Sequence, residues 1–283
     1  MPDLTLEETQ WQAAYDKLLA HGFKLRNRYK PINNDTENAL LPGNIIDAIV
    51  VPPELTLPPK VVLQFVNDKE LEIIEHLRST DTVEYVVPVL KSIPFDDDRT
   101  LLVMPFVARL ADGLKFDTSL ELIRVLLRLA EGLSAMHSHN VAHGAVYLAS
   151  FVEDRTTLVP GGFDFVSSQW TPDLKTKIEL ARGGRSKVKP KCYFADFRHA
   201  QQTSDPRSFS ADTESFKNIL IAGLHEKYKN LPRGLVQLIK GPQTTAQSIV
   251  AALTTLLDGD DVQLKRRKPW LASLYPKWIA AIQ

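Results

Sequence analysis

Carboxylates, imidazoles and a single thiol lie in two short stretches of the sequence where chemistry could take place. Asp196 and Cys192 lie in KCYFADFRHA, and three histidines, His137, His139 and His143, lie in HSHNVAH. A carboxylate at a strand end could hold Mg²⁺, and imidazoles are common zinc ligands. The two stretches therefore raise the question of a metal or nucleotide site.

The zinc and thiol chemistries have simple structural alternatives. A helix end followed by a strand separates the three imidazoles, so we do not expect them to converge on zinc. Cys192 lies in an apolar strand pattern and has only Lys191 as a charged neighbour, so we expect a buried, inert thiol. The sequence also has no Gly-x-Ser-x-Gly elbow to support acyl transfer.

Composition indicates an ordinary globular protein. The 283 residues are 44% hydrophobic and 24% charged, and 34 basic residues balance 34 acidic ones. A net charge of zero gives no global attraction to nucleic acid or anionic lipid. One cysteine suits a reducing compartment, and we find no signal-like N-terminus or long apolar run. We therefore expect an intracellular protein, cytoplasmic or nuclear, that makes no membrane contact.

The first hundred residues predict a strand-rich region with two helices. Thr5 and Glu8 have capping-box spacing and begin a helix over 5–21, with Trp11, Tyr15, Leu18 and Leu19 on one face. β-branched runs predict strands at 44–51, 60–66, 86–90 and 100–106. Asp68 begins a second helix, in which Leu71, Ile74 and Leu77 have helical spacing.

The pattern becomes mainly helical after Phe106. LELIRVLLRLAEGLSAMHSH predicts a long buried helix whose apolar face carries Leu120, Ile123, Leu126, Leu127, Ala130 and Leu133. Further helical patterns follow in ESFKNILIAGL, GLVQLIK, AQSIVAALTTLL and PKWIAAI.

Five motifs, in order, resemble those of a protein kinase. Gln64 stands where a kinase has its strand lysine, Glu70 where it has the partner glutamate, and His143 at the start of the catalytic loop. Ala145 stands for the catalytic Asp, Ser150 for the metal-binding Asn, and Asp196, Phe197 and Arg198 for the Asp-Phe-Gly triad. The segment LRNRYKP and the long excursion before YFADF make the chain most similar to the kinase-like domains of mushroom-forming fungi.

This resemblance implies an α+β, bilobal protein-kinase-like fold. Residues 1–105 would form a small strand-rich N-lobe with its N-terminal helix, and residues 106–283 a larger helical C-lobe. The resemblance also implies structural roles for His143, Phe197 and Asp212. His143 would pack beside the Asp-Phe pair formed by Asp196 and Phe197, and Asp212 would support the catalytic-loop backbone.

The same comparison predicts a loss of catalysis. Gln64 cannot neutralise phosphate, Ala145 cannot accept a proton, and Arg198 replaces a glycine with bulk and positive charge. Ser150 offers metal only a neutral oxygen, and Gly43 is the single glycine between residues 23 and 59. We therefore interpret the chain as a pseudokinase that binds protein partners or regulates them, and we expect no cofactor.

Two alternatives remain open. In the first, the chain is an atypical nucleotide-binding phosphotransferase or nucleotidyltransferase, in which Asp196 holds Mg-ATP and Glu70 orients it. Glu153 or Asp154 would then serve as acid or base, provided that they converge with Asp196. Without such a site, Glu70 would be a solvated or locally paired helix residue.

The second alternative is a nucleic-acid-binding module. It requires the basic runs at 181–191 and 264–268 to share one face, and short charge runs are more often solvated loops. We therefore expect a protein partner rather than nucleic acid. Trp270, Tyr275 and Trp278 would be core anchors of a terminal helix or, if exposed, interface residues.

Overall fold

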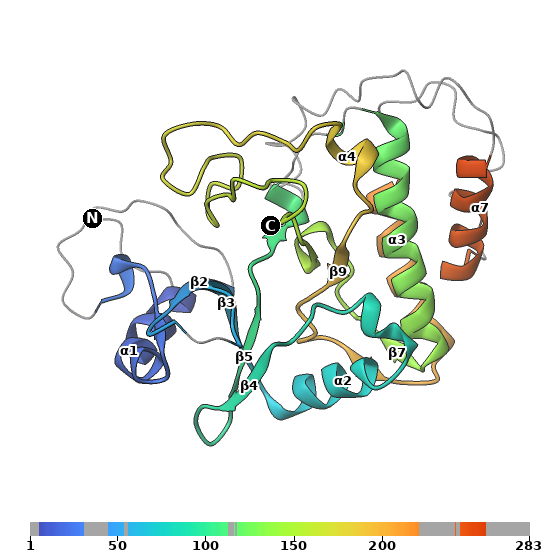
Figure 1. The fold of residues 1–283 in the computed structure, drawn as a ribbon. Coiled ribbons are helices and arrows are strands. Elements are labelled where there is room, and N and C mark those ends of the chain that lie inside the picture. The colour runs from blue at the N-terminus through green and yellow to red at the C-terminus, as the bar shows by residue number, and fades with distance from the viewer. Residues whose placement is uncertain are drawn as a thin grey trace.

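The computed structural model describes residues 6–30, 45–53, 56–112, 116, 118–220, 241 and 244–258. Its architecture is α+β, as the sequence predicts. An antiparallel sheet from the first part of the chain lies beside a group of helices from the later part (Figure 1).

The predicted elements appear in the expected order, but five of the ten described strands lie after Phe106, where the sequence predicted mainly helices. The helices are α1 (Leu6–Ala20), α2 (Asp68–Arg78), α3 (Ser119–Ser138), α4 (Gly184–Lys187), α5 (Pro206–Leu220) and α7 (Ala246–Asp258). The strands are β1 (Phe23–Lys24), β2 (Ile45–Val50), β3 (Lys60–Val66), β4 (Lys91–Pro94), β5 (Thr100–Pro105), β6 (Ala108–Arg109), β7 (Val141–Ala142), β8 (Phe151–Glu153), β9 (Cys192–Phe194) and β10 (Gln201–Gln202).

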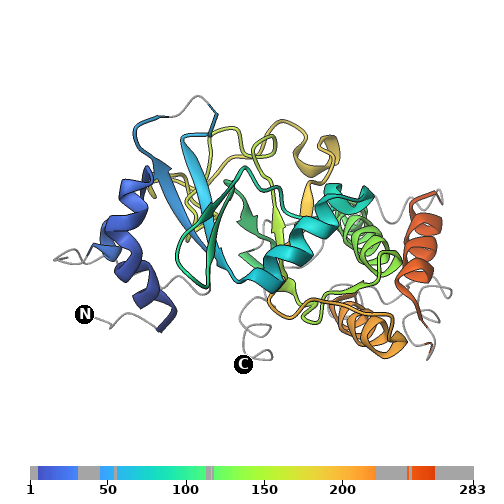
Figure 2. The ribbon, with the colours of Figure 1, turned by 90° about the horizontal axis from the view of Figure 1, so that it is seen from below.

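The five-stranded sheet has the order β1-β2-β3-β5-β4, and its central strand is covered on both faces. Successive side chains of a strand point to opposite faces. Phe65 stacks on Trp11 of α1 with ring centroids 4.6 Å apart, so α1 covers one face (Figure 2). Gln64 and Val66 therefore point to the other face, toward α2 and the later part of the chain.

Most sequence-predicted elements of this region are confirmed, with two corrections. The helix at 5–21, the strands at 44–51, 60–66 and 100–106, and the helix from Asp68 are present. Leu19, predicted on the buried face of the first helix, is 41% exposed. The predicted strand at 86–90 is wrong, because only Val86 forms an isolated bridge, to Phe194, and the strand lies at 91–94. Pro88 lacks the N–H that a paired strand needs.

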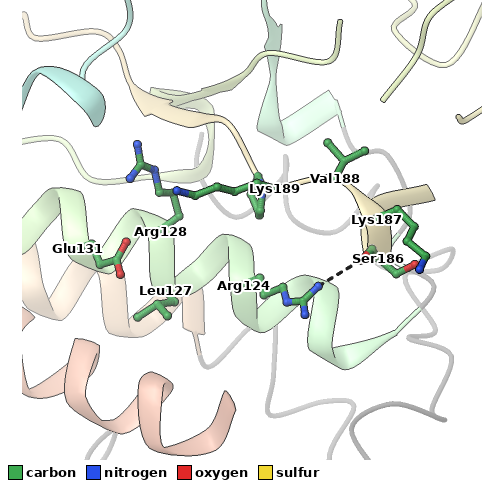
Figure 3. A pocket seen from close by; sticks show the side chains of 9 residues that line it. Arg124, Leu127, Arg128, Glu131, Ser186, Lys187, Val188 and Lys189 are labelled. Carbon is green, nitrogen blue, oxygen red and sulfur yellow. Dashed lines mark hydrogen bonds between the residues drawn. The ribbon is translucent and has the colours of Figure 1, made fainter. Parts of the chain in front are cut away.

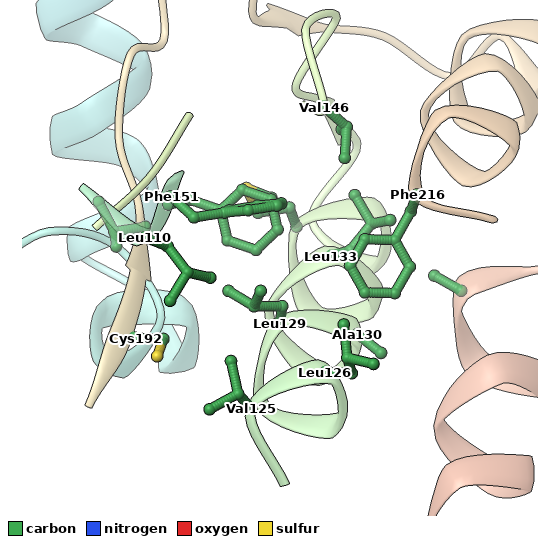
Figure 4. Packing of buried hydrophobic residues seen from close by; sticks show 14 of the residues in the cluster. Leu110, Val125, Leu126, Leu129, Ala130, Leu133, Val146, Phe151, Cys192 and Phe216 are labelled. Atoms are coloured by element: carbon green, nitrogen blue, oxygen red, sulfur yellow. The ribbon is translucent and has the colours of Figure 1, made fainter. Parts of the chain in front are cut away.

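A second apolar core forms around α3 (Figure 4). Its buried side chains on α3 are Leu122, Ile123, Val125, Leu126, Leu129, Ala130, Leu133 and Met136. They meet Phe151, Cys192 and Phe216 of β8, β9 and α5, while α7 packs along α3. The long helix is confirmed, but the predicted face is shifted, because Leu120 and Leu127 are only partly buried.

The segment LRNRY connects the sheet to distant parts of the chain. Arg26 donates to Asp47 of β2 at 2.8 Å and to Asp164 at 2.8 Å, a partner 138 positions later. Arg28 and Tyr29 donate to the buried carboxylate of Glu8 in α1. These bonds join α1, the sheet and the excursion that follows β8.

Several sequence predictions lie outside the described residues. They are the helices in GLVQLIK and PKWIAAI, the aromatic residues Trp270, Tyr275 and Trp278, and the basic run at 264–268. Among the described helices, none combines the length and the apolar character required to cross a lipid bilayer.

Candidate functional site

The first group of site residues meets where β3 faces α2. The Gln64 side-chain amide donates to Oε1 of Glu70 at 3.0 Å, and the backbone N–H of Phe197 donates to the same oxygen at 3.1 Å. Asn67 caps α2 by accepting from the N–H of Glu70, which sets the start of the helix. The structure thus brings together three residues that the sequence comparison had placed in one site.

Glu70 is buried, with 3% of its surface exposed, and its carboxylate accepts from Gln64, so of the two expected states, solvated or locally paired, the structure shows the second. Burial, together with the negative charge of Asp196, raises the pKa of Glu70 from 4.5 to about 7. The charge of Arg198 and the hydrogen bonds from Phe197 and Gln64 act in the opposite direction. The neutral amide of Gln64 therefore does not offset the effect of burial and of Asp196 on the pKa of Glu70.

Replacing Glu70 with Gln is expected to make the protein less sensitive to pH. Between pH 4.5 and about 7 the folded state holds a proton that the unfolded state releases, so the unfolding free energy of the wild type falls as pH rises. The variant should gain about 2–3 kcal/mol relative to the wild type between about pH 5 and pH 8. Urea unfolding at several pH values measures this, with exposed Glu72→Gln as the control. Parallel pH curves for wild type and Glu70→Gln would contradict the prediction.

The second group surrounds Asp196. The Arg198 guanidinium donates to both carboxylate oxygens, at 2.6 and 2.8 Å, and the Tyr147 hydroxyl donates to Oδ2 at 2.9 Å. Although burial opposes ionisation, Arg198 and Tyr147 hold the pKa of Asp196 below its ordinary value. Asp196 has φ +60°, a left-handed conformation that Asp tolerates better than most residues. Its carboxylate is therefore ionised and bonded to groups of this chain.

The third group is the loop that begins at His143. Asp212 of α5 is buried, and its carboxylate accepts from the backbone N–H groups of His143 at 2.7 Å and Gly144 at 2.8 Å. Gly144 has φ +73°, and a Cβ there would lie 2.2 Å from the carbonyl oxygen of His199, so only glycine fits. Asp212 thus fixes a loop whose path depends on that close approach.

His143 lies between two aromatic rings. Its centroid is 5.4 Å from that of Phe194 and 5.2 Å from that of Phe197, and its Nε2 is 3.2 Å from the carbonyl oxygen of Ala195. Complete burial lowers the pKa of His143. The geometry is that of a neutral packing residue beside the Asp-Phe pair.

Ala145 and Ser150 contribute little to a metal or proton-transfer site. Ala145 carries only a methyl group. The buried Ser150 hydroxyl donates to the carbonyl oxygen of Tyr147 at 2.6 Å and accepts from the N–H of Tyr147 at 3.2 Å. Ser150 therefore closes a local turn.

The remaining sequence candidates lie apart from one another. Nε2 of His137 contacts Asp212 and Nε2 of His139 contacts Asp81, whereas His143 faces Ala195. Within the described ranges, no three potential ligands come together as a metal site would require. Cys192 is buried, and burial raises the pKa of its thiol, which disfavours the nucleophilic thiolate.

Glu153 and Asp154 do not join Asp196. Glu153 of β8 pairs with Cys192 of β9. Cys192 lies at the end of β9 that is farther along the chain from Asp196. Its buried carboxylate accepts from Arg155 at 2.9 Å and from Arg185. Asp154 binds Thr156 and Lys191 instead. These partners leave neither carboxylate available as an acid or base beside Asp196.

Sequence reasoning missed two contributors to these clusters. Tyr147 contacts a carboxylate 49 positions later, and Arg185 contacts Glu153 across 32 positions. The basic run at 181–191 includes Arg185, but nothing local distinguishes its buried arginine from the exposed lysines beside it. The sequence showed a positive charge two positions after Asp196, at Arg198, but it did not predict that the two side chains pair.

Neither the protein-family models nor the curated protein sequences contain a match to this chain.

Proposed function

We propose that this chain is a bilobal, kinase-like protein that has lost phosphoryl transfer and serves as a protein-binding or regulatory scaffold. The proposal rests on the hydrogen bonds that the Asp196 carboxylate makes. The residue that would bind metal in a kinase is instead bonded through both oxygens to Arg198, and also to Tyr147. Phosphoryl transfer depends on charge stabilisation around such a metal.

Two further contacts support the kinase-like part of the proposal. Gln64 of β3 reaches Glu70 of α2, the place where a kinase has its lysine–glutamate pair. Asp212 holds the backbone of His143 and Gly144, the support that the sequence resemblance implies. The antiparallel sheet followed by helices is the order that an N-lobe and a C-lobe require.

The residues present do not fit a magnesium nucleotide. Asp196 would have to exchange a charged, doubly bonded guanidinium for a metal ion, and Gln64 brings no positive charge to a phosphate. Ala145 offers no carboxylate, and the Ser150 hydroxyl is bonded to Tyr147. We therefore derive no catalytic step through a nucleotide.

Thermal unfolding with millimolar ATP, with and without Mg²⁺, tests the proposal. The wild type should show no shift. A variant carrying Gln64→Lys, Ala145→Asp, Ser150→Asn and Arg198→Gly restores the kinase residues and serves as a comparison. Ligand at about 100 times its dissociation constant stabilises a protein by about 2.7 kcal/mol, which such a scan resolves readily.

The opposite result would favour the phosphotransferase or nucleotidyltransferase reading. That result is a wild-type shift that requires Mg²⁺ and disappears in Asp196→Ala. A search for transferred phosphate or nucleotide on added proteins would then follow.

A further inference from the structure

Residues 186–190 of the basic run at 181–191 form one wall of a groove on the surface of the protein. Side chains of α3 form the facing wall, and the space between them is about 380 Å³ (Figure 3). The lining residues are Arg124, Leu127, Arg128, Glu131, Ser186, Lys187, Val188, Lys189 and Pro190.

Positive charge predominates in this groove. Four of its side chains are cationic, namely those of Arg124, Arg128, Lys187 and Lys189, and Glu131 is the one carboxylate. Lys187 and Lys189 are exposed, and none of the residues that the structure describes pairs with either ammonium group. Two cations are thus available to a ligand.

The two arginines are held in place by contacts with the protein. Arg124 donates to the carbonyl oxygen of Ser186 at 3.4 Å, which links α3 to the facing wall (Figure 3). Arg128 donates to Glu84 at 3.0 Å and lies over the ring of Tyr85, 4.1 Å from its centroid. Side chains that are already ordered lose less entropy when a ligand binds.

The wall that carries the lysines is also anchored. Arg185 points inward and pairs with the buried carboxylate of Glu153, while Lys187 and Lys189 remain exposed. At the other end, the N–H of Asp154 donates to the carbonyl oxygen of Lys191 at 2.9 Å, and the Lys191 ammonium group pairs with Asp154. The lysines are therefore presented by a segment that is fixed at both ends.

We propose that this groove binds an acidic segment of a protein partner. The inference rests on the proposed scaffold function and names its docking surface. Carboxylates of an extended peptide would lie against Lys187 and Lys189, and the two arginines would add positive charge to the groove. Its apolar side chains would lie on Leu127, Val188 and Pro190, which supply the apolar part of the lining. Complementary charge of this kind directs association and selects partners.

A nucleic acid fits the groove less well than an acidic peptide. Glu131 lies in the groove and Glu84 beside it, so a continuous phosphate backbone would meet carboxylates. Single-stranded nucleic acids also use aromatic side chains on which bases stack, and the groove lining contains none. The chain as a whole carries no net positive charge.

Fluorescence anisotropy with a labelled peptide in which Glu alternates with Leu tests this proposal. The same peptide with Gln in place of Glu is the uncharged comparison, and a single-stranded oligonucleotide is the third probe. The variants are Lys187→Glu with Lys189→Glu, and a matched control, Lys177→Glu with Arg182→Glu. The control changes the net charge equally at exposed residues outside the groove.

The wild type and the control should bind the acidic peptide, and its affinity should fall by about tenfold or more in Lys187→Glu with Lys189→Glu. Affinity should also decrease with added salt. Equal affinity of the two variants, or no binding to the wild type, overturns the proposal. Tighter binding of the oligonucleotide, lost in the same variant, overturns it in favour of nucleic acid. ATP-dependent thermal shifts test the proposed function separately, so either idea can fail alone.

Discussion

Replacing Glu153 with Gln is expected to lower the unfolding free energy by about 3–5 kcal/mol, because two buried guanidinium groups would lose their counter-charge. Arg155 is fully buried and Arg185 is 6% exposed, and both pair with this single carboxylate. Burial alone would raise the pKa of Glu153, but Arg185 and Arg155 hold it below its ordinary value. Its contribution to stability is therefore present above about pH 4.5 and is lost as pH falls through the pKa of the folded state.

Urea unfolding at neutral pH measures this effect, and the neighbouring residue provides a matched control. Asp154 pairs with the half-exposed Lys191, so Asp154→Asn should cost less than about 1 kcal/mol. The double variant Glu153→Gln with Arg185→Met removes one of the unpaired cations and should recover part of the loss. Similar costs for Glu153→Gln and Asp154→Asn would show that the buried cluster is not a significant source of stability.

Replacing Asp212 with Ala is expected to cost about 4 kcal/mol of unfolding free energy. The substitution leaves the buried backbone N–H of His143 and the more exposed N–H of Gly144 without their acceptor, and each hydrogen bond to a charged group contributes about 1.5–3 kcal/mol. Both bonds end on a charged oxygen, which makes them stronger than neutral hydrogen bonds. Chemical denaturation of the variant and the wild type gives the difference.

The control for Asp212→Ala lies in the same region of the chain. Asp205 accepts from the N–H of Arg207 at the start of α5 and is exposed, so Asp205→Ala should cost about 1 kcal/mol, as for other helix caps. Amide hydrogen exchange adds a local measurement, because the amides of His143 and Gly144 should lose protection in Asp212→Ala. Retained protection at these two amides would contradict the assigned role of Asp212, whatever the change in overall stability.

Under the proposed function, these predictions distinguish residues that hold the structure in place from residues that would carry out phosphoryl transfer. Asp212 and His143 keep contacts that hold the loop in place. At the neighbouring positions, Ala145 cannot transfer a proton, and Arg198 occupies the Asp196 carboxylate that would bind a metal in a kinase. A protein that uses its kinase-like fold for binding needs the first kind of residue and not the second.

The sequence by itself determined the elements whose signals are local. The apolar period of 3.6 residues in α3 and the β-branched run of β3 predicted both elements correctly, because burial of one helical face or of a whole strand leaves its pattern in neighbouring residues. The strand at 91–94 was missed because its burial pattern is mostly exposed, so its apolar signal is small. The ordered motifs also singled out Gln64, Glu70, Asp196 and Asp212, and the structure places the first two in contact.

Only the tertiary structure decided how the charges of these residues are satisfied. The contact from Phe197 to Glu70 joins residues 127 positions apart, and the bond from Tyr147 to Asp196 joins residues 49 apart. The burial of Arg185 beside Glu153 likewise depends on how the excursion folds back onto β8. An ionisable side chain has the same local sequence signal whether it is solvated or buried. Its pKa and its role depend on burial and on partners that only the folded chain brings within a few ångströms.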